Sequence, residues 1–160
     1  MSSDPLSIRL ARRGDAALIA AMSRDLIESG LGWSWTAGRV LRAIADRETN
    51  VVVAEVAGQR AGFGIMSYRD EDAHLLLLAV HPARRRLGVG AALVTWLEAS
   101  ALAAGIGQVL LEARAGNAGA RAFYRRLGYA EVQRVPGYYQ GREASVRLAK
   151  DLWLERPTPA

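Results

Sequence analysis

The segment LAVHPARRRLGVGAALVTWLEAS, residues 78–100, decides the fold of this chain. An apolar run from Leu75 to Val80 predicts a buried strand that is covered on both faces. A short loop rich in arginine follows, and from Gly88 to Ala104 the apolar residues recur at helical spacing. A strand, a glycine-containing loop and a helix in this order predict an anion site, because the first backbone amides of a helix have no partner within it.

Gly88 and Gly90 are the residues that allow an anion to come close, because neither carries a side chain. Arg85 and Arg86 can add charge-assisted hydrogen bonds to a phosphate. An ordinary helix start uses similar residues, and dinucleotide folds also place glycines after a strand. The segment has no P-loop Gly-Lys-Ser/Thr, and we expect its strand to belong to an antiparallel meander instead of opening a βαβ unit. These features disfavour a nucleotide-binding interpretation.

The remaining segments predict a mixed α/β fold. Upstream, residues 6–11 alternate as a short strand, and Asp15 is expected to be the N-cap of a helix that continues to about Ser29. Residues 36–46 predict a second helix. Further strands are predicted at residues 50–56, 61–68, 108–114, 130–135 and 142–152, with a short helix within residues 116–129.

Size and composition predict one domain. The chain has 160 residues with 51% hydrophobic composition, and we expect a single domain at residues 1–155 and a frayed tail at residues 156–160. Cysteine is absent, so no thiol can carry an acyl group. The N-terminus has no secretory signal and no apolar run is long enough to cross a bilayer, so we expect a soluble cytoplasmic protein without a membrane partner.

The net charge of +5 comes mostly from arginine, which favours anionic partners. The cluster at residues 84–86 favours a local phosphate site over a nucleic-acid surface, so no nucleic-acid partner is expected. His74 and His81 flank one strand and point to opposite faces, so no metal site is expected.

Arg85, Gly88 and Gly90 match the pattern Arg/Gln-x-x-Gly-x-Gly/Ala, and the segment resembles motif A of the GNAT N-acetyltransferases. The resemblance implies the acyl-CoA N-acyltransferase fold, a mostly antiparallel central sheet of about seven strands flanked by four helices, with acetyl-CoA as cofactor. It also implies that a backbone N–H of the strand faces the thioester oxygen. The cofactor-binding residues that the resemblance implies here are Leu78, Ala79, Val80, Arg85, Arg86, Leu87, Gly88, Val89, Gly90 and Ala91.

Acetyl transfer to an amine requires a base near the nitrogen and an acid near the sulfur, and Glu112 and Tyr124 fit these two roles. Asn117 is a candidate helix N-cap, and Tyr124 follows two turns later on the same face. The alternatives are a strand glutamate paired with an arginine and a tyrosine that only packs, although Phe123 is better suited to the core.

The stretch LEARAGNAGARAFYRRLGYAEV, residues 111–132, resembles the second half of a GNAT domain. This resemblance implies that Asn117 contacts the cofactor and that Tyr124 contacts it and protonates the CoA thiolate. Within the superfamily the chain looks most like the RimI-type ribosomal-protein alanine N-acetyltransferases and related protein N-terminal acetyltransferases. That likeness implies Glu112 as the base, acting through water, in direct attack by a primary amine.

The acceptor is the least defined part of the prediction. Trp33 and Trp35, flanked by glycines, are candidates to line its pocket, and packing at a helix corner is the alternative for both. Tyr138 and Tyr139 fall where the hairpin of the family lines a peptide slot. A peptide N-terminus, a small-molecule amine and a non-catalytic acyl-CoA-binding module all remain open, and so does a homodimer.

Overall fold

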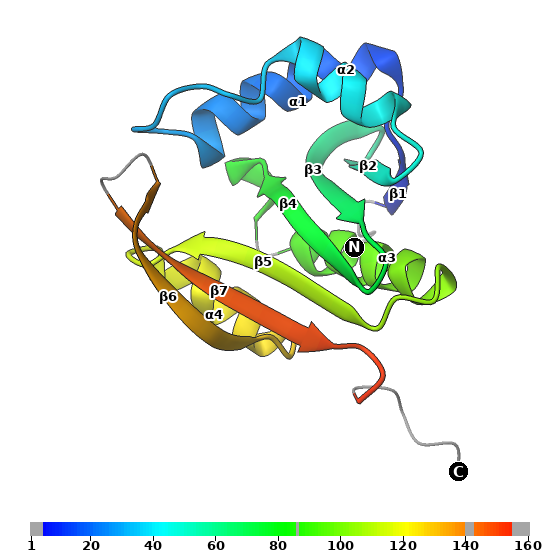
Figure 1. The fold of residues 1–160 in the computed structure, drawn as a ribbon. Coiled ribbons are helices and arrows are strands. Elements are labelled where there is room, and N and C mark those ends of the chain that lie inside the picture. The colour runs from blue at the N-terminus through cyan, green and yellow to red at the C-terminus, as the bar shows by residue number, and fades with distance from the viewer. Residues whose placement is uncertain (1–4, 86, 140–142, 155–160) are drawn as a thin grey trace. The chain divides into compact units, whose positions relative to one another are not determined.

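The computed structural model describes residues 5–85, 87–139 and 143–154, with the backbone alone at Tyr138, Tyr139 and Glu143. One sheet has the strand order β1-β2-β3-β4-β5-β7-β6 (Figure 1). The mixed α/β fold with seven strands and four α-helices is thereby confirmed. The strands and α-helices are β1 (Leu6–Leu10), α1 (Ala16–Met22), α2 (Ala37–Ala45), β2 (Thr49–Val56), β3 (Gln59–Tyr68), β4 (Asp72–Val80), α3 (Val89–Ala103), β5 (Gln108–Arg114), α4 (Ala118–Arg126), β6 (Ala130–Tyr139) and β7 (Glu143–Asp151).

The pairing of β4 with β5 corrects one expectation. β1 with β2, β2 with β3, β5 with β7 and β6 with β7 are antiparallel, but β4 and β5 are parallel. Helix α3 connects these two strands, so β4 does open a βαβ unit and the opposite expectation is wrong. The reason lies at the end of α3, where Gly105 at φ 80° reverses the chain and starts β5 in the direction of β4.

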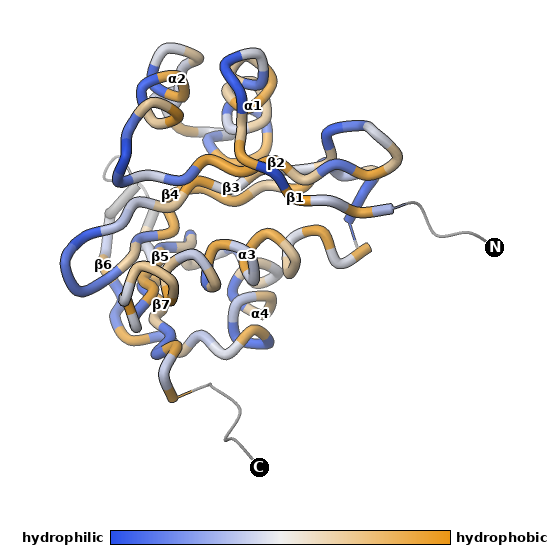
Figure 2. The backbone as a smooth tube through the Cα atoms, turned by 90° about the vertical axis from the view of Figure 1, so that its right-hand side faces the viewer, coloured by the Kyte–Doolittle hydropathy of each residue, from blue (hydrophilic) through white to orange (hydrophobic). Residues whose placement is uncertain are grey.

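The chain divides into two compact units. The first comprises the described residues of Met1–Ser67 and Leu76–Leu97, and the second those of Tyr68–Leu75 and Glu98–Ala160. In the first unit, α1 and α2 cover one face of β1–β3 (Figure 2). The core under these helices includes Ile19, Trp35, Val40, Val53, Phe63, Ile65 and Leu77.

Two glycines of β3 allow close packing within the first unit. A Cβ atom added at Gly62 would lie 2.7 Å from the carbonyl oxygen of Ala79, and one at Gly64 would lie 3.0 Å from Cδ1 of Leu97. The first half of α3 therefore packs over the glycines of β3. The expectation that β4 is covered on both faces is wrong in part, since Leu76 is 36% exposed.

In the second unit, β5 lies between β4 and β7, and α4 follows β5 in the chain (Figure 1). Along β5 the buried residues are Val109, Leu111 and Ala113, so the side chains of Leu110, Glu112 and Arg114 lie on the other face. Within the described residues, no helix is long and apolar enough to span a membrane.

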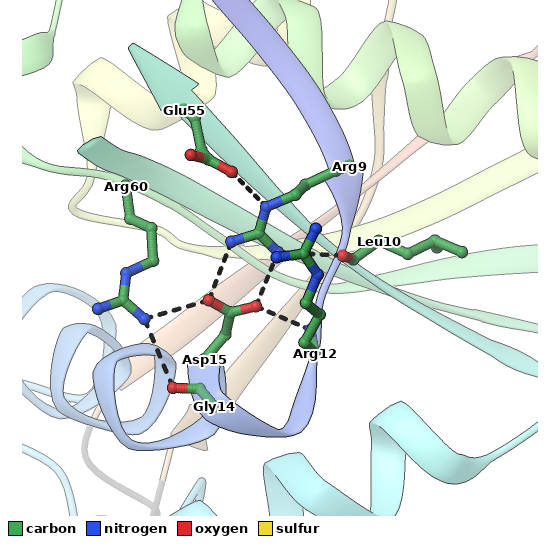
Figure 3. Close-up of polar contacts among 7 residues, drawn as sticks. All are labelled: Arg9, Leu10, Arg12, Gly14, Asp15, Glu55 and Arg60. Atoms are coloured by element: carbon green, nitrogen blue, oxygen red, sulfur yellow. Dashed lines mark hydrogen bonds and ion pairs between the residues drawn. The ribbon is translucent and has the colours of Figure 1, made fainter. Parts of the chain in front are cut away.

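Asp15 stands at the N-cap position of α1, as expected, but its side chain makes no capping hydrogen bond to this helix. Its carboxylate instead accepts hydrogen bonds from the backbone N–H of Arg12 at 2.7 Å and from Nη1 and Nη2 of Arg9 at 2.8 and 3.1 Å (Figure 3). Arg60 of β3 donates to the same carboxylate at 3.1 Å, and Arg9 also pairs with Glu55 of β2. Hydrogen bonding from Arg9 holds the pKa of the buried Asp15 carboxyl well below its usual value. This cluster ties β1 and the start of α1 to the β2–β3 hairpin.

We predict that Asp15→Asn lowers the free energy of unfolding by about 2 to 3 kcal/mol at pH 7, because Arg60 loses its charged partner and Arg9 keeps only Glu55. A carboxyl whose folded pKa is depressed stabilises the fold above its unfolded pKa of about 4, and this contribution is lost as the pH falls further. The difference between wild type and variant in urea unfolding should therefore shrink from pH 6 towards pH 3.

Asp25→Asn is the matched control, because Asp25 pairs with Arg24 on the exposed surface. It should change stability far less than Asp15→Asn. Equal losses in the two variants, or a loss for Asp15→Asn that does not depend on pH, would contradict the assigned role of the cluster.

Candidate functional site

The loop between β4 and α3 turns the chain into the helix through a left-handed residue. Gly88 has φ 77°, and a Cβ atom added there would meet nothing within 4 Å. The glycine is therefore required by its backbone conformation and faces open space. Helix α3 begins at the next residue, Val89, and its first hydrogen bond runs from the N–H of Ala92 to the carbonyl of Gly88 at 3.0 Å. The amides of the first turn point out of the helix end.

The arginine side chains of this loop differ in their surroundings. Arg85 is exposed, and its Nε donates to the carbonyl oxygen of Val80 at 3.4 Å. Arg84 donates from Nη2 to Oε1 of Gln59 at 3.3 Å. Arg86, a predicted phosphate contact, lies outside the described residues. The loop thus places one exposed guanidinium beside the start of α3.

The other residues predicted to contact the cofactor near Gly88 lie on β4, in the loop after it, or in the first turn of α3. Leu87 is exposed in the loop, Val89 is buried, and Gly90 and Ala91 lie in the first turn of α3. Leu78, Ala79 and Val80 form the end of β4, beyond Leu75, the last residue of β4 that pairs with β5. The described residues among those predicted to bind the cofactor within residues 78–91 therefore lie in the first unit, on the end of β4, the loop after it and the first turn of α3.

In the second unit, the side chain of Glu112 on β5 contacts side chains from the two neighbouring strands, β4 and β7. Its Oε1 accepts hydrogen bonds from Nη2 and Nε of Arg147 on β7, at 2.9 and 3.2 Å. Its Oε2 lies 2.5 Å from Nε2 of His74 on β4. The arginine partner that the sequence left open as an alternative is present, and His74 is a second partner that the sequence did not indicate.

The missed partner follows from the parallel register. His74 pairs with Leu110, and Glu112 is two residues further along the same face of β5. On β7, Arg147 lies directly opposite Glu112. The sequence interpretation did not predict that β4 and β5 are neighbours, so it could not bring these side chains together.

The carboxyl group of Glu112 is held in its ionised form. Burial raises its pKa, but the hydrogen bonds and charges of His74 and Arg147 outweigh this effect, and the pKa lies below its usual value. A carboxylate with a lowered pKa is a weaker proton acceptor than an unperturbed one. The Glu112 side chain is also only 9% exposed.

Tyr124 lies in an aromatic group of the second unit. Its ring packs edge-on against Phe123 at 5.0 Å and against Tyr129 at 5.7 Å between centroids. Tyr124 is buried and Phe123 is only partly buried, so the expectation that Phe123 is the better core residue is wrong. Asn117 caps α4 as predicted, with its side-chain oxygen accepting from the N–H of Ala120 at 3.0 Å.

Tyr129, which the sequence interpretation did not single out, has a strongly perturbed hydroxyl. It donates to Oε2 of Glu98 at 2.8 Å, and Lys150 also pairs with Glu98. Burial and the neighbouring Glu98 charge raise the pKa of Tyr129 far above its usual value. Tyr129 therefore stays protonated and serves as a fixed hydrogen-bond donor.

The predicted acceptor residues differ in exposure. Trp35 belongs to the core of the first unit, which is the packing role left open for it, while Trp33 is 45% exposed. The buried carboxylate of Glu28 accepts from Ser23 Oγ at 2.9 Å and from the N–H and Oγ of Ser34 at 2.7 and 2.6 Å. Glu28 thus fixes the segment that carries both tryptophans. The side chains of Tyr138 and Tyr139 lie outside the described residues.

We predict that Arg147→Met raises the pKa of the Glu112 carboxyl, because the variant removes both hydrogen bonds and the positive charge at Oε1. The measurement is an NMR titration of the glutamate side-chain carboxyl carbons. Lys150→Met is the control, since Lys150 pairs with Glu98 and should leave the Glu112 titration unchanged. An unaltered Glu112 titration in Arg147→Met would show that Arg147 does not hold the carboxylate ionised.

A family model and the related proteins both identify this chain as similar to N-acetyltransferases. Residues 20–129 match the model of the acetyltransferase (GNAT) family. The chain is 35% identical over 99 residues to an uncharacterized N-acetyltransferase of Methanocaldococcus jannaschii, covering 61% of this chain and 64% of the relative. It is 36% identical over 95 residues to the ribosomal protein bS18 alanine N-acetyltransferase of Escherichia coli K12, covering 58% of this chain and 64% of the relative.

Among solved structures, Ard1 from Thermoplasma volcanium superposes with a TM-score of 0.82 at 25% identity, covering 92% of this chain and 97% of that chain. The similarity to the two curated relatives spans less than two thirds of their length, 64% in each case.

Proposed function

Because the chain belongs to the acetyltransferase (GNAT) family, we propose that it transfers the acetyl group of acetyl-CoA to a primary amine. The observation that carries the proposal is the left-handed Gly88 at the start of α3, with open space where a side chain would project. Together with the exposed Arg85, this end of the helix has the shape and charge that suit a diphosphate. The family match, residues 20–129, runs through both compact units, which supports one domain at residues 1–155.

The residues of this strand, loop and helix fit coenzyme A. The amides from Gly88 to Ala91 would hold the diphosphate, with Arg85 adding charge. The backbone of Leu78, Ala79 and Val80 would pair with the pantetheine arm as an added strand does. When bound, acetyl-CoA supplies an activated acetyl thioester.

We propose a direct transfer to the amine, and the sequence has no cysteine that could form an acyl-enzyme. The acceptor amine must lose a proton, and the departing sulfur must gain one. We assign the acid role to Tyr124 and the base role to Glu112 together with the groups bonded to it. Asn117 would contact the cofactor from the start of α4.

We further propose that the acceptor is the N-terminus of a peptide or protein. The support is the similarity to the bS18 alanine N-acetyltransferase of Escherichia coli. The pKa of an α-amine is about 8 and that of a lysine side chain is about 10.4, so an α-amine needs less help from a base to lose its proton.

The test is an acceptor profile measured by CoA release. Peptides that begin with Ala or Ser are compared with lysine and polyamines at equal concentration. Turnover of the peptides at least about tenfold above that of the free amines is expected. Preference for a polyamine or amino acid would assign a small-molecule acceptor, and no CoA release with any amine would reject the enzymatic function.

For the acid, we predict that Tyr124→Phe lowers kcat by about 100-fold or more, because the departing sulfur loses its proton donor. The affinity for CoA, measured by calorimetry, should change little. Tyr129→Phe is the control, since its hydroxyl is bound to Glu98 and buried. Unchanged turnover in Tyr124→Phe would remove Tyr124 from the mechanism.

A further inference from the structure

We propose that Oγ of Ser145 and Nη1 of Arg147 form a carboxylate-binding subsite, which selects acceptor peptides with an acidic side chain at their second residue. The inference rests on the proposed acetyl transfer to a peptide N-terminus and names the substrate class within it. Both residues belong to the second unit and lie two positions apart on β7, so their side chains share one face of the strand.

Ser145 has an unsatisfied hydroxyl. Its Oγ is the only buried side-chain polar atom without a hydrogen-bond partner in the part of the chain that the structure describes, and the residue is 0% exposed. A buried hydroxyl without a partner destabilises a fold, so folded proteins contain few of them. An alanine would occupy the same place on the strand without this cost. A ligand that supplies the missing partner explains why a serine stands there.

Strand pairing places Ser145 on the same face of the sheet as Glu112. Ser145 lies directly opposite Arg114 on β5, and Arg147 lies directly opposite Glu112. Residues opposite each other in an antiparallel pair project from the same face, so these four side chains are neighbours. Because the proposed mechanism assigns Glu112 to the acceptor amine, the acceptor would lie on this face.

Arg147 has hydrogen-bond donors that its contact with Glu112 does not use. Nε and Nη2 both donate to Oε1 of Glu112, at 3.2 and 2.9 Å. A guanidinium has five N–H groups, and this contact takes two of them. Nη1 of Arg147 donates to none of the described residues, and the side chain is 40% exposed. This edge suits a carboxylate, because a hydrogen bond between two charged groups is stronger than one to a neutral carbonyl.

The two ends of this face differ in charge. Arg114 and Arg147 lie towards the end of β5, and Glu112 balances only one of these two positive charges. Asp72 and Asp151 flank the first residue of β5, at the other end of the face. An acidic side chain of an acceptor is therefore attracted to the end that carries Ser145, and a basic one is repelled from it.

The subsite would hold one carboxylate between two donors. The hydroxyl of Ser145 donates to one carboxylate oxygen, and Nη1 of Arg147 donates to the other. The same guanidinium contacts Glu112, so a carboxylate bound at Nη1 lies close to an amine beside Glu112. This proximity assigns the acidic side chain to the second residue of the peptide.

The kinetic test compares two peptides that begin with Ala-Glu or Ala-Gln and are otherwise identical. The wild type should use the Ala-Glu peptide with a kcat/KM at least about tenfold higher, measured by CoA release. Arg147→Met should bring the ratio of the two kcat/KM values close to one. The ratio is the readout because the loss of Arg147 also changes Glu112, and this effect is common to both peptides. Equal kcat/KM values in the wild type would overturn the proposal.

Arg134→Met is the matched control, because Arg134 on β6 lies opposite Val146 and therefore on the other face of the sheet. It removes the same charge and should keep the wild-type ratio. An equal fall of the ratio in Arg134→Met and Arg147→Met would assign the preference to net charge and overturn the subsite.

Ser145→Ala separates the hydroxyl's role in binding from its role in the fold. The Tm of this variant should equal or exceed that of the wild type, because an unpaired buried hydroxyl is removed. The ratio of the two kcat/KM values should nevertheless fall by about threefold or more. A lowered Tm with an unchanged ratio would show that the hydroxyl serves the fold alone.

Calorimetry of peptide binding in the presence of CoA tests the subsite without turnover. The Ala-Glu peptide should bind the wild type at least about tenfold more tightly than the Ala-Gln peptide, and Arg147→Met should remove the difference. If no amine causes CoA release, the proposed function fails, and this difference in affinity would still support the subsite. Equal affinities of the two peptides for the wild type would overturn it.

Discussion

The parallel pairing of β4 with β5 is the constraint on which both the start of α3 and the Glu112 cluster depend. A parallel pair requires a crossover, and α3 supplies it, so the helix must begin just beyond the end of β4. Its first-turn amides are then displayed at that strand end, and Gly88 makes the turn in a conformation that other residues rarely adopt. The same pairing sets His74 opposite Leu110 and therefore on the face of Glu112.

Three carboxylates, Asp15, Glu28 and Glu112, have different hydrogen-bond partners. Asp15 is buried between arginines and fastens the start of the chain to the β2–β3 hairpin. Glu28 is buried among neutral donors, and burial raises its pKa, but the bonds from Ser34, Ser23 and Trp35 outweigh this and lower it. Glu112 differs from both because its partners lie on two neighbouring strands, His74 on β4 and Arg147 on β7.

The sequence predicted the features that depend on local order and failed where strand neighbours mattered. Glycines, apolar periodicity and Asn117 were enough to place α3, α4 and most strands, because helix caps and strand alternation are local. The parallel register was missed, and with it His74, since pairing joins segments more than thirty residues apart. Asp15 and Glu28 were also beyond reach, because their partners are set by how loops and strands pack. The acceptor residues stay predictions, with Trp35 found in the core.

The central claim is that the start of α3 holds coenzyme A, and calorimetry with Gly88→Ala tests it most directly. The matched control is Gly105→Ala at the other end of the helix, since both glycines have φ near 80° and open space at the Cβ position. Each variant should lose about 1 to 2 kcal/mol of stability from the same left-handed strain. CoA should bind the wild type and Gly105→Ala alike, and Gly88→Ala at least about tenfold more weakly. No heat of binding with the wild type, or equal affinity in the two variants, would contradict the account.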